Sequence, residues 1–356
     1  MKNNLERMIE TKPQTTEIQV RNKPSNNSGD MALAMINILS QNYGTHNIAS
    51  NVLALTKTIN NGDVKAFLKS DENGFPIACA ALVKINEFEV ELGRAACIPG
   101  SNGGNGQLMI EAFSQWKNNN LFPDSKILRA EVRTAKSTKE VPGGQATQAI
   151  CLNKIGFIPT AMVPIFHHGV PDRQEVFLLA SIIKENNNLN FDSEKLLPTT
   201  IGGKTEREMF SIFWKRFFGK LPNFSNKSGE NSGSINLEAK VSGPIVEVRT
   251  SENTNNIDFV IEKFFEADGR FALARIPIDL SIEQIASVSA QLRKSGFKLA
   301  GFEPSINEGA ISIDILFGKL SENGKRLMVL PSFTENVFSH KDEEILIQNS
   351  ILWRQN

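Results

Sequence analysis

The sequence contains little of what several large classes of protein require. Its only cysteines are Cys79, Cys97 and Cys151, and they lack the spacing of a metal site, so we expect no bound metal and reduced thiols in a cytoplasmic protein. Lys and Arg total 39, as do Asp and Glu, so the chain lacks the basic excess of a nucleic-acid-binding protein. No apolar run approaches the roughly 20 residues of a membrane span, and the polar first twenty residues predict no signal peptide.

Two widespread phosphate-binding motifs are also missing. The complete Gly-x-x-x-x-Gly-Lys-Ser/Thr pattern of P-loop nucleotidases does not occur, and the main glycine cluster does not have the Gly-x-Gly-x-x-Gly spacing of dinucleotide-binding folds. The length of 356 residues and the 40% hydrophobic content are those of a globular protein with room for two domains.

Residues 89–117 carry the most informative pattern in the chain. Residues 89–97 alternate between charged and apolar and then become small and apolar, which predicts a strand that enters a core. A turn follows, rich in Pro99, Gly100, Gly103, Gly104 and Gly106. Helical spacing then begins, with apolar residues at Leu108, Met109, Ala112, Phe113 and Trp116. The start of such a helix offers free backbone N–H groups and a positive dipole end to an anion such as a pyrophosphate.

The first half of the chain alternates helices and strands around this segment. After a polar terminus at 1–14, strands are predicted at 16–21, 64–69, 75–84, 87–97, 127–133, 157–165 and 175–182, and helices at 31–41, 48–59, from 107, and at 144–154. An Asp-Glu-Asn-Gly turn at 71–74 predicts a hairpin between the second and third strands. We expect one domain over residues 15–184.

The second half has a different character. Residues 185–235 read as a connector that contains an amphipathic helix at 205–218 and a linker-like stretch at 223–234. Residues 236–356 then predict an extended segment at 237–250, helices at 257–267 and 280–294, and strands at 270–277, 298–302 and 311–318. Ser281 followed by Gln284 predicts a capping box at the second of these helices.

Three motifs in register resemble the GNAT superfamily of acyl-CoA N-acyltransferases. The turn at 101–106 resembles that family's Arg/Gln-x-x-Gly-x-Gly/Ala loop, residues 149–157 resemble its helix-to-strand segment ending in Gly-Phe, and residues 71–78 resemble its hairpin. The resemblance covers roughly residues 15–182. It implies an α/β (α+β) fold with a mixed, mostly antiparallel sheet flanked by helices.

The C-terminal region repeats part of this pattern. Residues 292–297 (LRKSGF) mimic residues 152–157 (LNKIGF), and two strands follow each of them. No glycine-rich turn precedes the second copy. The region is therefore expected to be a smaller, degenerate GNAT-like half without its own CoA site, with a generic α+β domain as the alternative.

The resemblance also implies which residues bind acyl-CoA, with acetyl-CoA as the first expectation. The backbone of Cys97 and Ile98 matches the family's oxyanion donors, and the pyrophosphate loop comprises Ser101, Asn102, Gly103, Gly104, Asn105 and Gly106. Two positions depart from the family. Ser101 stands where the family has Arg or Gln, and Leu152 stands where many members have a Tyr that protonates the departing thiolate. Many members transfer the acyl group without that acid, because CoA thiolate is a good leaving group.

Carboxylates on the predicted strands are the candidates for proton transfer. Acyl transfer to an amine needs a base for the amine proton and donors for the thioester oxyanion. Glu91 is our first candidate for the base, with a salt bridge to Arg94 as the alternative role, and Glu131 is the second. Four further residues are predicted to contact the substrate: Arg133, His167, His168 and Arg173.

Two functions stay open at this point. The first is an N-acetyltransferase that transfers an acyl group from CoA to an amine of a small molecule, without nucleic acid or membrane as a partner. The second is a non-catalytic GNAT-like module that binds CoA or a protein partner and regulates it. Ser101 and Leu152 favour the second function, and the glycine turn with Glu91 favours the first. The sequence leaves a homodimer open.

Overall fold

The computed structural model describes most of the chain. The described residues are 27–43, 51–101, 103–136, 144–164, 174–184, 195–226, 236–242, 245–251, 256–307 and 310–355. The strand predicted at 16–21 and the N-terminal segment 1–14 lie outside them.

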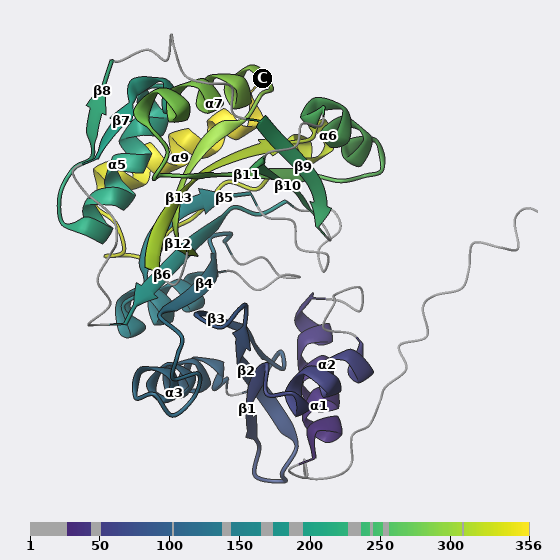
Figure 1. Ribbon diagram of the computed structural model, residues 1–356. Coiled ribbons are helices and arrows are strands. Elements are labelled where there is room, and N and C mark those ends of the chain that lie inside the picture. Colours follow the sequence, from purple (N-terminus) through teal and green to yellow (C-terminus); the bar gives the residue numbers. More distant parts are fainter. Residues whose placement is uncertain are drawn as a thin grey trace, which may run out of the picture.

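The described strands form one eleven-stranded sheet and a separate pair (Figure 1). The order in the large sheet is β1-β2-β3-β4-β6-β5-β12-β13-β11-β10-β9. The first half of the chain, up to residue 183, comprises α1 (Ser28–Tyr43), α2 (Val52–Asn60), β1 (Val64–Ser70), β2 (Pro76–Lys84), β3 (Glu89–Cys97), α3 (Asn105–Lys117), β4 (Ile127–Arg133), α4 (Gln145–Gln148), the π-helix η2 (Ala149–Ile155), β5 (Ile158–Val163) and β6 (Phe177–Ile183). The elements predicted between residues 31 and 182 are therefore present.

The second half continues the same sheet. It comprises β7 (Leu196–Pro198), the 3-10 helix η3 (Thr199–Ile201), α5 (Lys204–Phe218), β8 (Asn223–Ser225), β9 (Asn236–Ser242), β10 (Ile245–Ser251), α6 (Ile257–Glu266), β11 (Phe271–Pro277), α7 (Ile282–Lys294), β12 (Lys298–Asn307), β13 (Ala310–Leu320), α8 (Glu322–Leu327) and α9 (His340–Arg354). The predicted capping box is present at α7, where Ser281 and Gln284 each accept a backbone N–H of the other.

The two halves repeat one topology in mirror order. Reading outward from the centre of the sheet, β5-β6-β4-β3-β2 corresponds to β12-β13-β11-β10-β9. Within the eleven-stranded sheet, β3–β4 and β10–β11 are parallel pairs, and α3 and α6 connect the two strands of each pair. The recurrence expected from the two Gly-Phe motifs is confirmed. Because the halves share a sheet, the boundaries that we expected at 184/185 and 235/236 stay predictions.

The halves join where β5 meets β12, through the antiparallel pair Ala161 and Gly301. Both strands have an irregularity here, between Pro159 and Ala161 and between Leu299 and Gly301. Gly301 has a φ of 137°, and a Cβ on it would lie 2.4 Å from the Thr160 carbonyl oxygen. Only glycine fits this junction, because the backbone conformation and the approach of β5 both exclude a side chain.

Gly301→Ala is expected to destabilise the protein by about 2–4 kcal/mol, since backbone strain and overlap with β5 add. Urea denaturation measures this change in the free energy of unfolding. Gly156→Ala is the matched control, because Gly156 also has a positive φ of 90° but has no atom within 4 Å of its Cβ position. Equal losses in the two variants would show that the junction tolerates a side chain.

Helices cover the two faces of the sheet unequally. Alternate residues of β2, β3 and β4, such as Leu82, Val90 and Leu128, belong to the large core that also contains residues of α3, η2, α5, α6, α7 and α9. The smaller core on the opposite face contains residues of α1 and α2 packed on β1, β2 and β3. Among the described helices, α1 and α2 are thus the ones that pack on this second face, at the β1–β3 end of the sheet (Figure 1).

Several features of the second half were predicted wrongly or missed. The extended segment predicted at 237–250 is an antiparallel pair, β9 and β10, and the sequence contains a turn signal, Gly243-Pro244, between the two strands. Residues 223–225 lie in the predicted linker-like stretch but form β8 beside β7. Helix α9 was missed, although Ser339 caps it by accepting the Asp342 N–H. Its Trp353 ring lies edge-on against Phe271 of β11.

Candidate functional site

Strands β3 and β4 separate midway along their length. They pair in parallel from Glu89 and Ile127 to Glu91 and Arg129, after which β3 continues only with β2, and β4 with β6. The β2–β3 ladder shifts by one residue at the same place, and Arg94 there has a φ of 51°. A bulge of this kind bends its strand. The two strands therefore leave a gap between them, and it opens toward Cys97.

The glycine turn follows directly at the wide end of this gap. Gly100, Gly103 and Gly104 have φ values of 81°, 67° and 124°, so each uses a conformation that favours glycine. Gly104 is the N-cap of α3 and provides no side-chain cap for its N–H groups. A Cβ on Gly103 would meet no atom within 4 Å. The turn thus presents open backbone at a helix N-terminus, which is the geometry that suits a phosphate group.

Two neighbouring side chains complete the turn. Ser101 donates its hydroxyl to the Ile98 carbonyl at 2.7 Å, which closes the turn. Lys69 of β1 lies beside Gly104, with its Nζ 2.9 Å from the position that a Cβ on Gly104 would occupy. Sequence reasoning missed Lys69, because it lies more than 30 residues before the turn and only the sheet brings it there. Lys69 thus places a positive charge beside the turn, where Ser101 places none.

The backbone at the end of β3 differs between Cys97 and Ile98. The Ile98 N–H donates to the Ile77 carbonyl at 2.8 Å, so it is used in the ladder with β2. Hydrogen-bonded residues alternate along an antiparallel pair, and the backbone of Cys97 therefore faces the gap. Asn42 of α1 donates to the Cys97 carbonyl at 2.9 Å. Of the two predicted oxyanion donors, the Cys97 N–H thus points away from β2 toward the gap, whereas the Ile98 N–H is bonded to β2.

Glu91 points along β3 toward the opening of the gap. A Cβ on Gly93 would lie 2.4 Å from its Oε1, so the carboxylate occupies the space that this glycine leaves. Desolvation by the surrounding protein raises the pKa of Glu91, while the nearby Arg94 and Arg129 guanidinium groups act in the opposite direction. A raised carboxylate pKa suits a group that accepts a proton near neutral pH.

Glu131 of β4 lies on the same face as Glu91. Its side chain keeps access to solvent, yet protein surrounds it closely enough that desolvation, with the Glu91 and Glu303 carboxylates, raises its pKa to about 8; Arg275 acts in the opposite direction. The two candidate bases are therefore neighbours, and each disfavours the charge on the other.

The protonated form of Glu131 makes a pH-dependent contribution to stability. Its folded-state pKa of about 8 lies above the ordinary value of 4.5, so its contribution is complete below pH 4.5 and is lost as the pH rises through 8. Glu131→Gln should leave the melting temperature unchanged at pH 4.5 and raise it relative to wild type by pH 8.5. Thermal melts across this range test the prediction, with the exposed Glu72→Gln as control. A difference that does not change with pH would contradict it.

A chain of ion pairs lies beside these carboxylates and joins the two halves. Arg129 binds Glu89 at 2.9 Å and Glu303 of β12 at 2.6 Å, and Glu303 also binds Arg275 of β11. Strands β6 and β5 lie between β4 and β12, which places β4 about 14 Å from β12 in a flat sheet. Direct contact therefore indicates that this face of the sheet is concave. The second half therefore extends the sheet and supplies Glu303 to this face.

Arg133 is a correction to the predicted substrate residues. Its Nε and a terminal nitrogen bind the two Glu175 oxygens at 2.8 and 2.6 Å, and both residues are buried. The guanidinium fork is thus used within the protein and is not free for a substrate carboxylate. Leu152 is buried in the large core, so no acidic side chain occupies the place of the family's Tyr. Asn102, His167, His168 and Arg173 lie outside the described residues.

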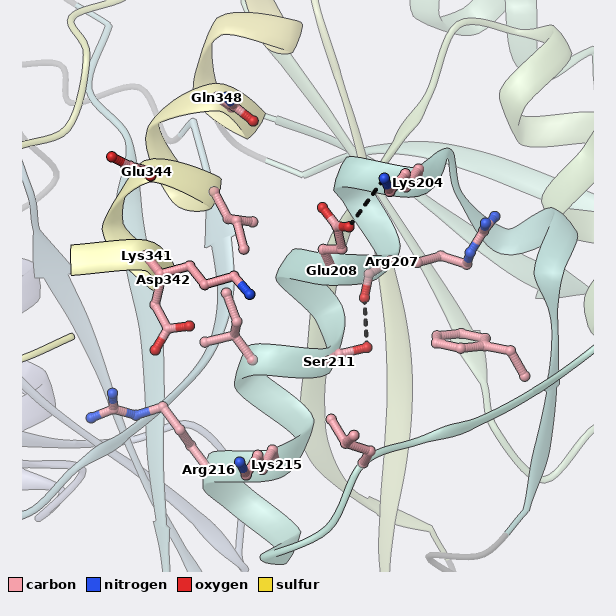
Figure 2. Close-up of a pocket in the computed structure, with 14 residues that line it drawn as sticks. Lys204, Arg207, Glu208, Ser211, Lys215, Arg216, Lys341, Asp342, Glu344 and Gln348 are labelled. Atoms are coloured by element: carbon pink, nitrogen blue, oxygen red, sulfur yellow. Dashed lines mark hydrogen bonds and ion pairs between the residues drawn. The ribbon is translucent and has the colours of Figure 1, made fainter. Parts of the chain in front are cut away.

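A groove of about 850 Å³ lies elsewhere, between α5 and α9 (Figure 2). Its walls carry five basic side chains: Lys204, Arg207, Lys215, Arg216 and Lys341. Figure 2 shows Lys341 extending from α9 toward α5. None of the lining residues belongs to β3, β4 or α3. The residues of the β3–β4 gap and of the glycine turn therefore lie apart from this groove.

The described residues contain neither a cluster of metal ligands nor a membrane-spanning helix. Within these ranges no three or more His, Cys, Asp or Glu side chains are grouped as metal ligands. Across the same ranges, every helix is too short or too polar to span a bilayer.

Comparisons with known proteins show likeness in structure but not in sequence. No protein-family model and no curated protein sequence matches the chain. Solved structures similar to it include a Vibrio cholerae spermidine N-acetyltransferase in complex with CoA and spermine (16% identity, 44% of this chain and 90% of that one, TM-score 0.31). A second is a Staphylococcus aureus N-acetyltransferase (13% identity, 45% of this chain and 93% of that one, TM-score 0.32). A third is a Vibrio fischeri ribosomal-protein-S5-alanine acetyltransferase (14% identity, 44% of this chain and 90% of that one, TM-score 0.32). Each covers less than half of the chain. The mixed, mostly antiparallel sheet flanked by helices is the fold that the resemblance of the sequence to the GNAT superfamily implied.

Proposed function

We propose that the protein is an acyl-CoA-dependent N-acyltransferase that transfers an acyl group, in the first instance acetyl, to an amine of a small molecule. One observation carries the proposal: the gap between β3 and β4 has the glycine turn at its wide end and two carboxylates of raised pKa on its face. The three free cysteines fit a reducing compartment, so we place the reaction in the cytoplasm.

The residues of the site divide between binding and chemistry. Gly103, Gly104 and the first N–H groups of α3 would bind the pyrophosphate of CoA, and Lys69 would add a positive charge beside it. The Cys97 N–H would donate to the thioester oxygen as negative charge develops on it.

Transfer forms a C–N bond to the amine and breaks the C–S bond of the thioester. Glu91 would accept the proton that the amine loses, and Glu131 would bind or deprotonate the acceptor from the neighbouring strand. The proton finally neutralises the departing thiolate, which requires no side-chain acid. Leu152 is compatible with this scheme, because CoA thiolate leaves readily.

The competing function is a GNAT-like module that binds CoA without catalysis, which the absence of an acid at Leu152 favours. Calorimetry with CoA tests binding, and a thiol-release assay with acetyl-CoA over a panel of small amines tests turnover. Micromolar binding with amine-dependent thiol release supports the enzyme. Binding without release from any amine would support the module, and the absence of binding would reject both.

A further inference from the structure

In the second half of the chain, Arg275 occupies the position that corresponds to Glu131, the second candidate for the base, in the first half. Glu131 pairs with Leu179, which pairs with Ala161 on β5. In the second half, Arg275 pairs with Leu316, which pairs with Gly301 on β12. Because Ala161 and Gly301 each lie four residues after the Phe of their Gly-Phe motif, Arg275 stands where Glu131 stands in the first half.

Arg129 is the charged group most able to neutralise the candidate bases. It is in register with Glu91 and two residues before Glu131, on the same face of β4. An arginine that binds a carboxylate directly stabilises its charged form and so makes it a weaker base. However, the two terminal nitrogens of Arg129 are bound elsewhere: one by Glu303, and the other by Glu89 and by the Pro304 carbonyl at 2.7 Å.

Glu303 forms ion pairs with both Arg129 and Arg275. One of its oxygens binds Arg129 and the other binds Arg275, and its side chain is 7% exposed. Burial acts to raise the pKa of Glu303, but Arg129 and Arg275 outweigh burial and lower its pKa overall, so Glu303 stays charged at neutral pH.

We propose that Glu303, from the second half of the chain, is a positioning residue of the acceptor site, which holds Arg129 and Arg275 and so keeps both guanidinium groups from binding Glu91 and Glu131. The degenerate half thus completes the site of the first half. The role of Glu303 in catalysis rests on the proposed function. Its effect on the pKa of Glu131 does not.

The charges that act on Glu131 come from three other strands. Glu91 faces it from β3, Glu303 from β12 and Arg275 from β11. Asp314 of β13 lies next to Glu303 and Arg275, and its own pKa is raised by burial. Replacing Glu303 by Gln removes one negative neighbour and frees two positive ones. Both changes favour the charged form of Glu131.

A double-mutant stability cycle, in which Glu131 and Glu303 are replaced singly and together, tests without any substrate whether Glu303 affects the pKa of Glu131. The effect of Glu131→Gln on the melting temperature is measured from pH 4.5 to 9 in the parent protein and in Glu303→Gln. We expect the midpoint of this pH dependence to fall by about one pH unit or more in Glu303→Gln. An unchanged midpoint would overturn the proposal, because Glu303 would then have no influence on Glu131.

Two further variants guard against a general loss of structure. Glu303→Asp keeps the charge and should return the midpoint most of the way to that of the parent. Arg275→Gln removes a positive neighbour of Glu131 and should move the midpoint upward, opposite to Glu303→Gln. If Glu303→Gln does not fold, the upward shift in Arg275→Gln carries the test, and its absence rejects the proposal.

The pH profile of thiol release links the residue to catalysis. Glu303→Gln should move the acidic limb of kcat to lower pH and reduce the plateau, with the dissociation constant of CoA unchanged. A lower rate with the limb in place would indicate a merely structural role and overturn the assignment. If no amine supports turnover in the parent protein, the proposed function fails, while the stability cycle still decides the role of Glu303.

Discussion

Gly104→Glu is expected to lower the affinity for CoA by about 100-fold or more. Gly104 has a φ of 124° at the N-cap of α3, where backbone N–H groups would bind the pyrophosphate. A glutamate there would fill the phosphate position, add negative charge and contact Lys69, whose side chain lies 2.4 Å from the Cβ position. Loss of two charge-assisted hydrogen bonds corresponds to about 3–6 kcal/mol.

Calorimetry with CoA measures this loss directly. Gly219→Glu is the matched control, since Gly219 has a φ of 75°, has no atom within 4 Å of its Cβ position and lies at the end of α5. Both variants should melt cooperatively, and the control should keep the affinity of the parent. CoA binding of ordinary strength to folded Gly104→Glu would remove the glycine turn from the proposed site.

Glu91→Gln is expected to reduce turnover by about 10²–10⁴-fold, which is the usual scale for loss of a general base. The amide keeps the shape of the side chain but cannot accept the proton. Because Glu91 has a raised pKa, wild-type turnover should rise with pH as this group loses its proton, and the variant should lack that acidic limb. Its affinity for CoA should change little. Steady-state thiol release from pH 5 to 9 provides the measurement.

Two variants calibrate the result. Glu89→Gln is unsuitable as a neutral control, because Glu89 is buried and binds Arg129. Glu247 is better matched: it lies on β10 at the place that corresponds to Glu91 on β3, and Glu247→Gln should leave turnover unchanged. Gly93→Ala should also reduce turnover, since its Cβ would displace the Glu91 carboxylate. Near-normal rates in Glu91→Gln at every pH would transfer the role of base to Glu131 or to water.

Local patterns were sufficient for most of the first half. Alternation in residues 89–97 and helical spacing from Leu108 to Trp116 predicted β3 and α3, because each pattern reflects which side chains a neighbouring core can bury. The Gly-Phe motifs at 156–157 and 296–297 predicted the repeated topology, because each ends a helix and is followed by two strands. The glycine turn could be recognised from local sequence alone, because the positive φ values of Gly100, Gly103 and Gly104 favour glycine whatever lies around them.

The sequence by itself determined the order of strands and helices in the first half of the chain, the glycine turn, and Glu91 and Glu131 as candidates for the base. Tertiary structure alone decided which charges act on those bases. Lys69 reaches the turn through the β1–β2–β3 pairing, Glu303 reaches Arg129 across two intervening strands, and Arg133 is used by Glu175. The physical reason is distance: ion pairs and desolvation act over a few ångströms in space between residues that are up to about 170 positions apart in the chain, and a linear pattern holds no record of that proximity.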